Sequence, residues 1–191
     1  GSSPADPVLV IQAMGRRIGY IPAAARLADP GREMPLVILL AEAGITIEEA
    51  TDAINDMVRR HGRAIVVVSE GFDVGSVGEV RDAFGHVSFG ASKQTVAAIL
   101  VNHLNDVGLP CKGAARGQVP GTDQRDTMIY ASVVDLDEAY RIGQNAALIA
   151  REHGNGYMST ILRKPGLIYN VYYDKVPLEA VANSERTFPK E

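Results

Sequence analysis

Residues 36–68 read LVILLAEAGITIEEATDAINDMVRRHGRAIVVV, and this stretch decides the fold. Two short apolar runs rich in β-branched residues, 36–40 and 64–68, flank a segment, 47–61, whose apolar side chains recur with helical spacing. Thr46 is a suitable N-cap for that helix and Gly62 a suitable stop. Because both runs are almost continuously apolar, they are typical of parallel strands covered on both faces. The stretch therefore predicts a strand, a helix and a second strand.

The same alternation extends towards the start of the chain. Residues 8–11, Val-Leu-Val-Ile, form a third apolar run, and the Ala-rich segment 17–28 separates it from the run at 36–40. The order of elements is then β-α-β-α-β, which favours an α/β fold with a mostly parallel sheet flanked by helices.

Downstream of residue 68 the pattern changes. Residues 71–90 contain five glycines and little periodicity, and we expect them to form a long functional or mobile loop within one domain that spans residues 1–191. Beyond it, the sequence predicts a helix capped by Ser92 and reaching about Asp106, an extended piece at 111–116, helices at 123–133 and 136–152, and strands at 157–162 and 167–173.

Composition limits the function classes. The chain has 191 residues, 46% of them hydrophobic, and a net charge of −4, which argues against a disordered, fibrous or nucleic-acid-coating protein. A single cysteine, Cys111, excludes an intrachain disulfide and a clustered thiolate metal site. No apolar run approaches the roughly 20 residues of a membrane-spanning helix, and the first residues lack the order of a signal peptide. We expect a soluble cytoplasmic protein without nucleic-acid or membrane partners.

The candidate ligand-binding residues follow the apolar runs. Met14, Gly15 and Arg16 come directly after the first run, where ligands of open α/β sheets bind. Glycine lets a backbone approach a ligand closely, and arginine offers a forked donor to phosphate, although a glycine in such a turn can also be purely conformational. The phosphate-binding patterns G-x-x-x-x-G-K-[ST] and G-x-G-x-x-G are absent from the sequence.

Other charged residues lie at corresponding places. Glu42 follows the second run and is expected at the same end of the sheet, either as a hydrogen-bond acceptor for a sugar hydroxyl or as a solvated acid. Glu70 follows the third run and can partner a backbone amide or an arginine. Arg116 and Arg125 flank a Pro-Gly turn, as phosphate ligands or as surface charges. His86, in the Gly-rich loop, is a weak candidate for catalysis.

Taken in order, these segments resemble the phosphofructokinase family over nearly the whole chain. The later stretch, from Ala131-Ser132 through Asp137-Glu138-Ala139-Tyr140 to Gly156-Tyr157-Met158, looks most like the pyrophosphate-dependent branch. The segments that carry the resemblance are Val10-Ile11-Gln12-Ala13-Met14-Gly15-Arg16-Arg17-Ile18-Gly19-Tyr20, Leu39-Leu40-Ala41-Glu42, Val67-Val68-Ser69-Glu70-Gly71 and Val119-Pro120-Gly121-Thr122-Asp123-Gln124-Arg125.

The resemblance implies a role for each candidate. Met14, Gly15, Arg16 and Glu42 would bind fructose 6-phosphate, and Arg16 would also be catalytic by stabilising the phosphoryl group in transfer. The family's Gly-His-x-Gln-Arg motif falls on residues 121–125, with Thr122 in place of the histidine and Arg125 as the arginine that binds the sugar phosphate. Arg116 matches an arginine that reaches a neighbouring subunit's site, so the resemblance implies a homo-oligomer.

Two of the family's motifs are missing from this sequence. The Gly-Gly-Asp loop of the phosphoryl donor and the Thr-x-Asp-x-Asp segment, which supplies the catalytic base and helps to hold magnesium, lie upstream of Met-Gly-Arg in the family. We therefore expect the C-terminal, sugar-phosphate-binding portion of a glycolytic phosphofructokinase, inactive alone, with Mg²⁺ held mainly by the upstream portion. The resemblance favours pyrophosphate as the donor, with ATP left open. The alternative is a non-catalytic sugar-phosphate-binding or regulatory module.

Overall fold

The structure is a computed structural model that describes residues 5–75 and 94–189. The chain divides into two compact units, which we call unit 1 (Gly1–Arg125 with Arg186–Glu191) and unit 2 (Asp126–Glu185). His86, Ser92 and most of the Gly-rich loop expected at 71–90 lie outside the described residues. Among the described helices, none is both long and apolar enough to cross a membrane.

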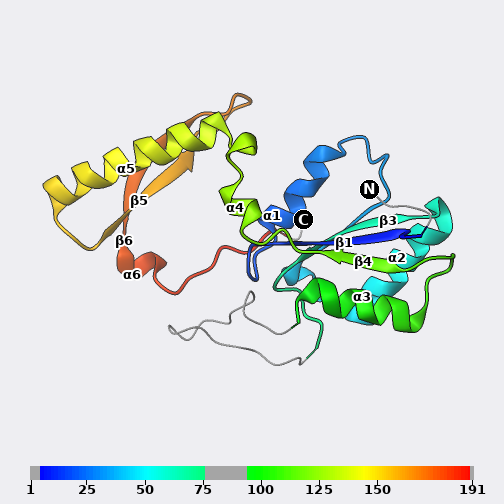
Figure 1. The fold of residues 1–191 in the computed structure, drawn as a ribbon. Coiled ribbons are helices and arrows are strands. Elements are labelled where there is room, and N and C mark those ends of the chain that lie inside the picture. The colour runs from blue at the N-terminus through cyan, green and yellow to red at the C-terminus, as the bar shows by residue number, and fades with distance from the viewer. Residues whose placement is uncertain (1–4, 76–93, 190–191) are drawn as a thin grey trace. The chain divides into compact units, whose positions relative to one another are not determined.

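Unit 1 is built on a four-stranded parallel sheet (Figure 1). Its strand order is β2-β3-β1-β4, and the strands are β1 (Val8–Ala13), β2 (Leu36–Leu39), β3 (Ala64–Ser69) and β4 (Ala115–Gln118). The central strand β1 pairs with β3 from Val8↔Ala64 to Ala13↔Ser69 and with β4 from Val8↔Ala115 to Ile11↔Gln118. The three strands predicted from the apolar runs and the mostly parallel sheet are confirmed.

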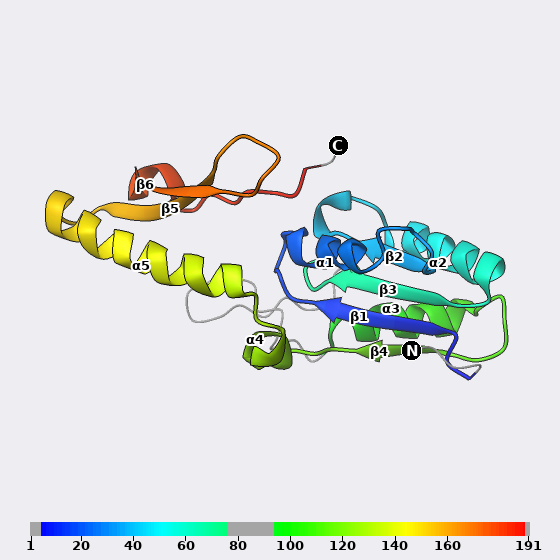
Figure 2. The ribbon, with the colours of Figure 1, turned by 90° about the horizontal axis from the view of Figure 1, so that it is seen from above.

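Helices cover both faces of this sheet (Figure 2). On one face, α2 (Ile47–His61) and α3 (Val96–Val107) bury Ile54 and Leu100 against Val10 and Val66. On the other face, Ala25 packs with Leu36, Ile38 and Val67. That residue opens the 3-10 helix η1 (Ala25–Ala28), which follows the short helix α1 (Tyr20–Ala24). Successive residues of β3 alternate between the two faces, which is why nearly every position in its run is apolar.

The best-predicted helix is α2, because its ends carry local signals. Thr46 Oγ1 accepts the Glu49 N–H at 3.2 Å, and the Glu49 side chain accepts the Thr46 N–H at 2.8 Å, which together form a capping box. Gly62 ends the helix with φ of 70°, a left-handed conformation that favours glycine.

Several expected boundaries are wrong. The helix expected to begin at Ser92 begins at Val96, with Thr95 as its N-cap. The helix expected at 123–133 is instead one short helix, α4 (Asp123–Asp126), followed by a 3-10 turn, η3 (Met128–Tyr130). The extended piece expected at 111–116 is the strand β4 (Ala115–Gln118), so it begins later than expected, at Ala115, and extends beyond residue 116 to Gln118.

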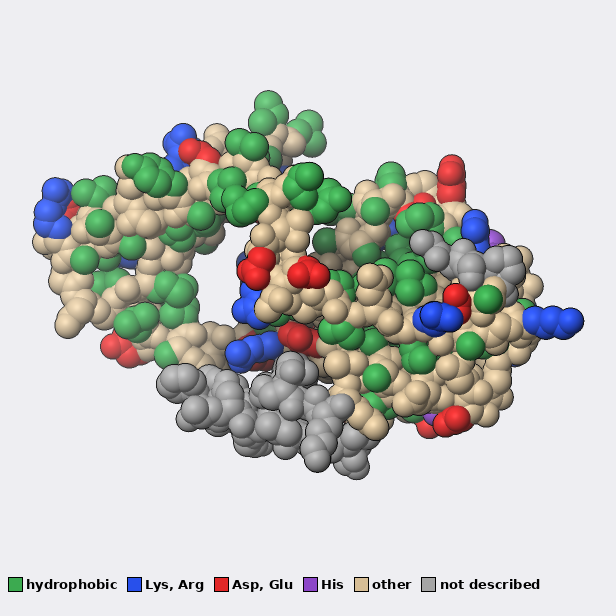
Figure 3. Space-filling model, viewed as in Figure 1, with side chains coloured by type: hydrophobic (Ala, Val, Ile, Leu, Met, Phe, Trp, Pro, Cys, Tyr) green, Lys and Arg blue, Asp and Glu red, His purple; other side chains and the backbone are tan. Residues whose placement is uncertain are grey.

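Unit 2 consists of a long helix against a hairpin. Its elements are α5 (Val133–His153), β5 (Tyr157–Arg163), β6 (Val171–Pro177) and α6 (Leu178–Val181), and β5 pairs antiparallel with β6. Asn145 Nδ2 on α5 donates to Ser159 Oγ at 2.8 Å and to the Asp174 carbonyl at 3.2 Å, which fixes the helix on the hairpin. Ile149 is buried, whereas many other apolar side chains of this unit are exposed (Figure 3).

Candidate functional site

The candidate site lies where the four parallel strands of unit 1 end. Because all four strands run in the same direction, the loops that follow them meet at one edge of the sheet (Figure 1). These loops carry Met14, Gly15 and Arg16 after β1, Glu42 after β2, Glu70 after β3, and Thr122 and Arg125 after β4. The expectation that Glu42 lies at the same end of the sheet as Met-Gly-Arg is confirmed.

The loop at 14–19, which we call the Met-Gly-Arg loop, turns sharply. Gly15 has φ of 136° and Arg16 has φ of 52°, so two successive residues have positive φ. The Ile18 N–H donates to the Gly15 carbonyl at 2.9 Å and closes the turn. A non-glycine residue enters the left-handed region at a cost of about 1 kcal/mol, so Arg16 needs support from its surroundings.

That support comes from the end of β3. Glu70 Oε1 accepts the N–H of Gly15 at 3.0 Å and the N–H of Arg16 at 2.8 Å. Ser69, which is fully buried, donates its hydroxyl to the Arg16 carbonyl at 3.0 Å. One carboxylate and one hydroxyl thus hold both peptide groups of Arg16. The hydrogen bonds to the carboxylate are charge-assisted and are therefore the stronger ones.

Gly71, directly after β3, allows the end of this strand to lie close to the Met-Gly-Arg loop. A Cβ at this position would lie 2.1 Å from the Arg16 carbonyl oxygen and 2.9 Å from the Arg17 Cα. Both atoms belong to backbone and cannot swing aside, so a side chain at residue 71 requires the Met-Gly-Arg loop to move.

The loop after β4 also reaches the Met-Gly-Arg loop. Gln124 Oε1 accepts the Met14 N–H at 3.1 Å, and the turn around Gln124 is closed by the Arg125 N–H, which donates to the Thr122 carbonyl at 2.8 Å. The Gly-x-x-Gln-Arg segment therefore lies beside Met14. Arg16 and Arg125 are both exposed, and neither guanidinium has an ion-pair partner among the described residues.

Glu42 contacts the far end of the same loop. Its Oε1 accepts the Gly19 N–H at 2.8 Å and the Phe188 N–H at 2.9 Å, while Oε2 is buried without a hydrogen-bond partner in the described part of the chain. Desolvation raises the pKa of Glu42, but hydrogen bonds from the Phe188, Gly19 and Glu42 amides outweigh it, so the pKa lies below its ordinary value. The carboxylate is therefore ionised at neutral pH.

Arg116 lies apart from these residues. It sits inside β4 opposite Leu9, and its guanidinium pairs with Asp6, which precedes β1 at the other edge of the sheet. Its side chain is 71% exposed. The structure thus brings together six of the seven residues that the resemblance assigns to the substrate, and Arg116 is not among them.

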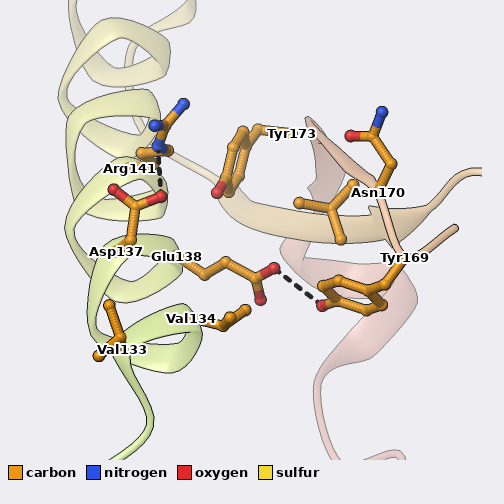
Figure 4. Close-up of a pocket in the computed structure, with 9 residues that line it drawn as sticks. Val133, Val134, Asp137, Glu138, Arg141, Tyr169, Asn170 and Tyr173 are labelled. Atoms are coloured by element: carbon orange, nitrogen blue, oxygen red, sulfur yellow. Dashed lines mark hydrogen bonds and ion pairs between the residues drawn. The ribbon is translucent and has the colours of Figure 1, made fainter.

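A separate cavity of about 480 Å³ lies in unit 2, between α5 and the end of the hairpin (Figure 4). Tyr169 donates its hydroxyl to Glu138 at 2.8 Å, and Arg141 pairs with Asp137 at 2.7 Å. The hydrogen bond to Glu138 raises the pKa of Tyr169. The lining of this cavity holds two carboxylates and one guanidinium, so it offers less to an anion than the exposed arginines of unit 1 do.

The next feature is the arrangement of side chains that could bind a metal ion. Within residues 5–75 and 94–189, no three His, Cys, Asp or Glu side chains gather in a way that could hold a metal ion. The described residues therefore do not fit a magnesium site by themselves.

Sequence reasoning recognised some supporting residues and missed others. The expectation that Glu70 partners a backbone amide is confirmed at two amides. The roles of Ser69, Gly71 and Gln124 were missed, because each acts on a loop more than 50 residues away in the sequence. Their one sequence signal was their place within the segments that carry the family resemblance.

The chain is similar to known proteins over nearly its whole length. No family model matches the chain. It is 33% identical over 190 residues to a pyrophosphate–fructose 6-phosphate 1-phosphotransferase of Methylococcus capsulatus, covering 96% of this chain and 44% of the relative. A protein of the same name from Halomonas elongata is 30% identical, again over 96% of this chain and 44% of its own length.

The chain is also similar to a solved structure. The pyrophosphate-dependent phosphofructokinase from Nitrosospira multiformis superposes with a TM-score of 0.73 at 31% identity, covering 97% of this chain and 43% of that one. The chain thus spans less than half the length of the relatives it matches. These comparisons show that the chain is similar, over nearly its whole length, to pyrophosphate-dependent phosphofructokinases.

Proposed function

We propose that this chain is the sugar-phosphate-binding portion of a phosphofructokinase. The parent enzyme would transfer a phosphoryl group from pyrophosphate to the 1-hydroxyl of fructose 6-phosphate. The observation that carries the proposal is that Glu70 and Gln124 both contact the Met-Gly-Arg loop. These contacts join three loops into one surface with two exposed arginines, which have no ion-pair partner within the described part of the chain. The names of the relatives supply the substrate and the donor.

Each residue of the site would have its own role in binding the sugar phosphate. Arg125 would bind the 6-phosphate, since a guanidinium matches phosphate oxygens with a fork of donors. Met14 and Gly15 would place the backbone against the sugar, and Thr122 would supply a hydroxyl where the family has a histidine. Arg116 would serve a neighbouring subunit in a homo-oligomer, which fits its exposed position away from the other residues.

The transfer step itself needs the rest of the parent enzyme. The sugar's 1-hydroxyl oxygen forms a bond to a phosphorus of pyrophosphate, the bond from that phosphorus to the bridging oxygen breaks, and phosphate leaves. A base from the upstream portion takes the hydroxyl proton. Arg16 would stabilise the charge that develops on the phosphoryl oxygens, and magnesium, held by the upstream portion, would offset the charge of the donor.

The proposal is tested by calorimetric titration of fructose 6-phosphate into this chain. Arg16→Ala and Arg125→Ala should each weaken binding by about tenfold or more, because each removes a charge-assisted contact. Arg60→Ala is the matched control, since Arg60 is an exposed arginine at the far end of α2. Equal affinities for the two site variants, the control and the unaltered chain would overturn the assignment.

The alternative, a sugar-phosphate-binding module without catalysis, makes a different prediction about the gene. An in-frame Gly-Gly-Asp loop and Thr-x-Asp-x-Asp segment upstream of Gly1 would support the enzyme, and a start codon immediately before Gly1 would support the module. We also propose that the chain alone does not transfer phosphoryl groups, which an assay for fructose 1,6-bisphosphate formed from pyrophosphate would check.

A further inference from the structure

The last described residues of the chain return to the candidate site. They follow unit 2 in sequence, yet they belong to unit 1 by their contacts. The Phe188 N–H donates to Glu42 Oε1 at 2.9 Å, and the Phe188 ring packs edge-on against Tyr20 with 5.1 Å between ring centroids. Tyr20 in turn donates its hydroxyl to the Thr187 carbonyl at 3.2 Å. We call residues 187–188 the terminal latch.

The latch is anchored at Phe188. Residues 182–187 are all exposed, whereas Phe188 is half-buried and its ring contacts Tyr20. The contacts of the latch reach Tyr20, at the start of α1, and Glu42, in the 3-10 turn η2 (Ala41–Ala43). The latch therefore connects the segments that follow β1 and β2, although Phe188 and Glu42 are 146 residues apart in the sequence.

The two carboxylate oxygens of Glu42 differ in their hydrogen bonds. Oε1 accepts two N–H groups, from Gly19 and Phe188, whereas Oε2 is buried and accepts no hydrogen bond within the described part of the chain. A buried carboxylate oxygen without a donor is costly, and such groups in folded proteins normally gain a donor from water or a ligand. Oε2 is thus the oxygen of Glu42 that is left to accept a sugar hydroxyl, which is the contact that the resemblance implies for this residue.

The latch restricts where that second oxygen can lie. A glutamate side chain has several rotatable bonds, and a hydrogen bond from Gly19 alone leaves the carboxylate free to turn about this contact. The Phe188 N–H is a second donor to the same oxygen and comes from a different segment, so the carboxylate must satisfy both. A group that is already fixed loses less conformational freedom when a ligand binds, which favours affinity.

We propose that the terminal latch is a positioning element of the substrate site, which holds Glu42 Oε1 on the chain so that Oε2 accepts a hydroxyl of the sugar phosphate. Thr187 and Phe188 act through Tyr20 and Glu42 and do not themselves contact the substrate. This inference rests on the proposed function, and it adds the end of the chain to the residues on which substrate affinity depends.

The first test measures the affinity for fructose 6-phosphate by calorimetry. Phe188→Ala should weaken binding by roughly three- to tenfold, because Glu42 loses its fixed orientation, and Glu42→Ala should weaken it by about tenfold or more. Phe188→Tyr keeps a ring against Tyr20 and should stay within about twofold of the unaltered chain. The double variant Glu42→Ala/Phe188→Ala should bind no more weakly than Glu42→Ala, since the latch acts through Glu42. Leu178→Ala, an exposed apolar truncation in unit 2, is the control and should leave the affinity unchanged.

The second test separates the latch from the arginines of the site. Inorganic phosphate has no sugar hydroxyl, so its binding, followed by NMR titration, should depend on Arg125 and not on the latch. Arg125→Ala should weaken phosphate binding by about tenfold or more, whereas Phe188→Ala should leave it within about twofold of the unaltered chain.

Failure of the latch and failure of the proposed function give different results. An affinity of Phe188→Ala for fructose 6-phosphate within about twofold of the unaltered chain, or equal losses for fructose 6-phosphate and phosphate, would overturn the latch. If the unaltered chain binds no fructose 6-phosphate, the proposed function fails, and the hold of the latch on Glu42 is then judged from the Gly19 amide resonance of the ligand-free chain. A shift in Phe188→Ala that Leu178→Ala does not cause would support that hold, and an unchanged resonance would overturn it.

Discussion

Gly71 sets the distance between the ends of β1 and β3, because only a residue without Cβ allows the Arg16 carbonyl so close. We expect Gly71→Ala to lower the free energy of unfolding by about 2 kcal/mol or more, since two backbone segments must separate. Urea denaturation would measure the loss. The shift would also displace Arg16, so affinity for fructose 6-phosphate should fall with it.

The matched control for this change is Gly31→Ala. A Cβ at Gly31 would meet only the flexible side chain of Glu33, at 3.4 Å. The control should stay within about 0.5 kcal/mol of the unaltered chain. If Gly71→Ala were as stable as Gly31→Ala, the result would contradict the close approach of the end of β3 to the Met-Gly-Arg loop.

Glu42 gives the chain a pH dependence whose sign follows from its environment. Its pKa in the folded state lies below the ordinary value because backbone amides hydrogen-bond the carboxylate, despite the opposing effect of desolvation, which is the largest single contribution. The stabilisation it provides is therefore complete well above the unfolded pKa of about 4.3 and is lost as the pH falls through the lower folded pKa.

The measurement compares unfolding free energies of the unaltered chain and Glu42→Gln between pH 7 and pH 3. The variant should be less stable at pH 7, and the difference should shrink as the pH falls below about 4.3, because protonation removes the charge that the variant lacks already. A difference that is constant over this range would show that the charge of Glu42 does not matter to the fold.

At the scale of elements, prediction succeeded where the signal is local. Helix α2 was predicted from Ile47 to His61 because its cap, its apolar stripe and its final glycine all lie within 17 residues of sequence, from Thr46 to Gly62. The strands β1, β2 and β3 were predicted because their runs are buried on both faces. In each case local preference and tertiary burial favour the same structure.

Prediction failed where tertiary contacts override local preference. Residues 123–133 contain good helix formers, yet the chain turns at Thr127, and Gln124 accepts the Met14 N–H across the site. The strand expected from Leu167 begins at Val171, where pairing with Arg163 starts. The site shows the same limit. Its substrate residues could be proposed from motifs, but the hydrogen bonds that Glu42 accepts from the Gly19 and Phe188 amides could not.

At the scale of the whole molecule, the two units differ in how well they bury their apolar side chains. Unit 1 has a continuous core on one face of its sheet, including Val10, Ile54 and Leu100, all fully buried. In unit 2, Val133, Leu136 and Tyr140 share one face of α5 at helical spacing and are 81%, 52% and 68% exposed. An apolar helical stripe of this kind is normally covered by protein.

We therefore expect the isolated chain to self-associate, with the exposed face of α5 as the contact. Sedimentation velocity at micromolar concentrations should show species larger than 20.4 kDa whose share grows with concentration. The double variant Val133→Ser/Tyr140→Ser should shift the population towards monomer, because it removes the large apolar side chains at both ends of the stripe. Leu27→Ser is the control, since Leu27 is 81% exposed but lies in unit 1. A chain that stays monomeric throughout, or a Leu27 variant as effective as the double variant, would mean that the stripe on α5 does not drive association.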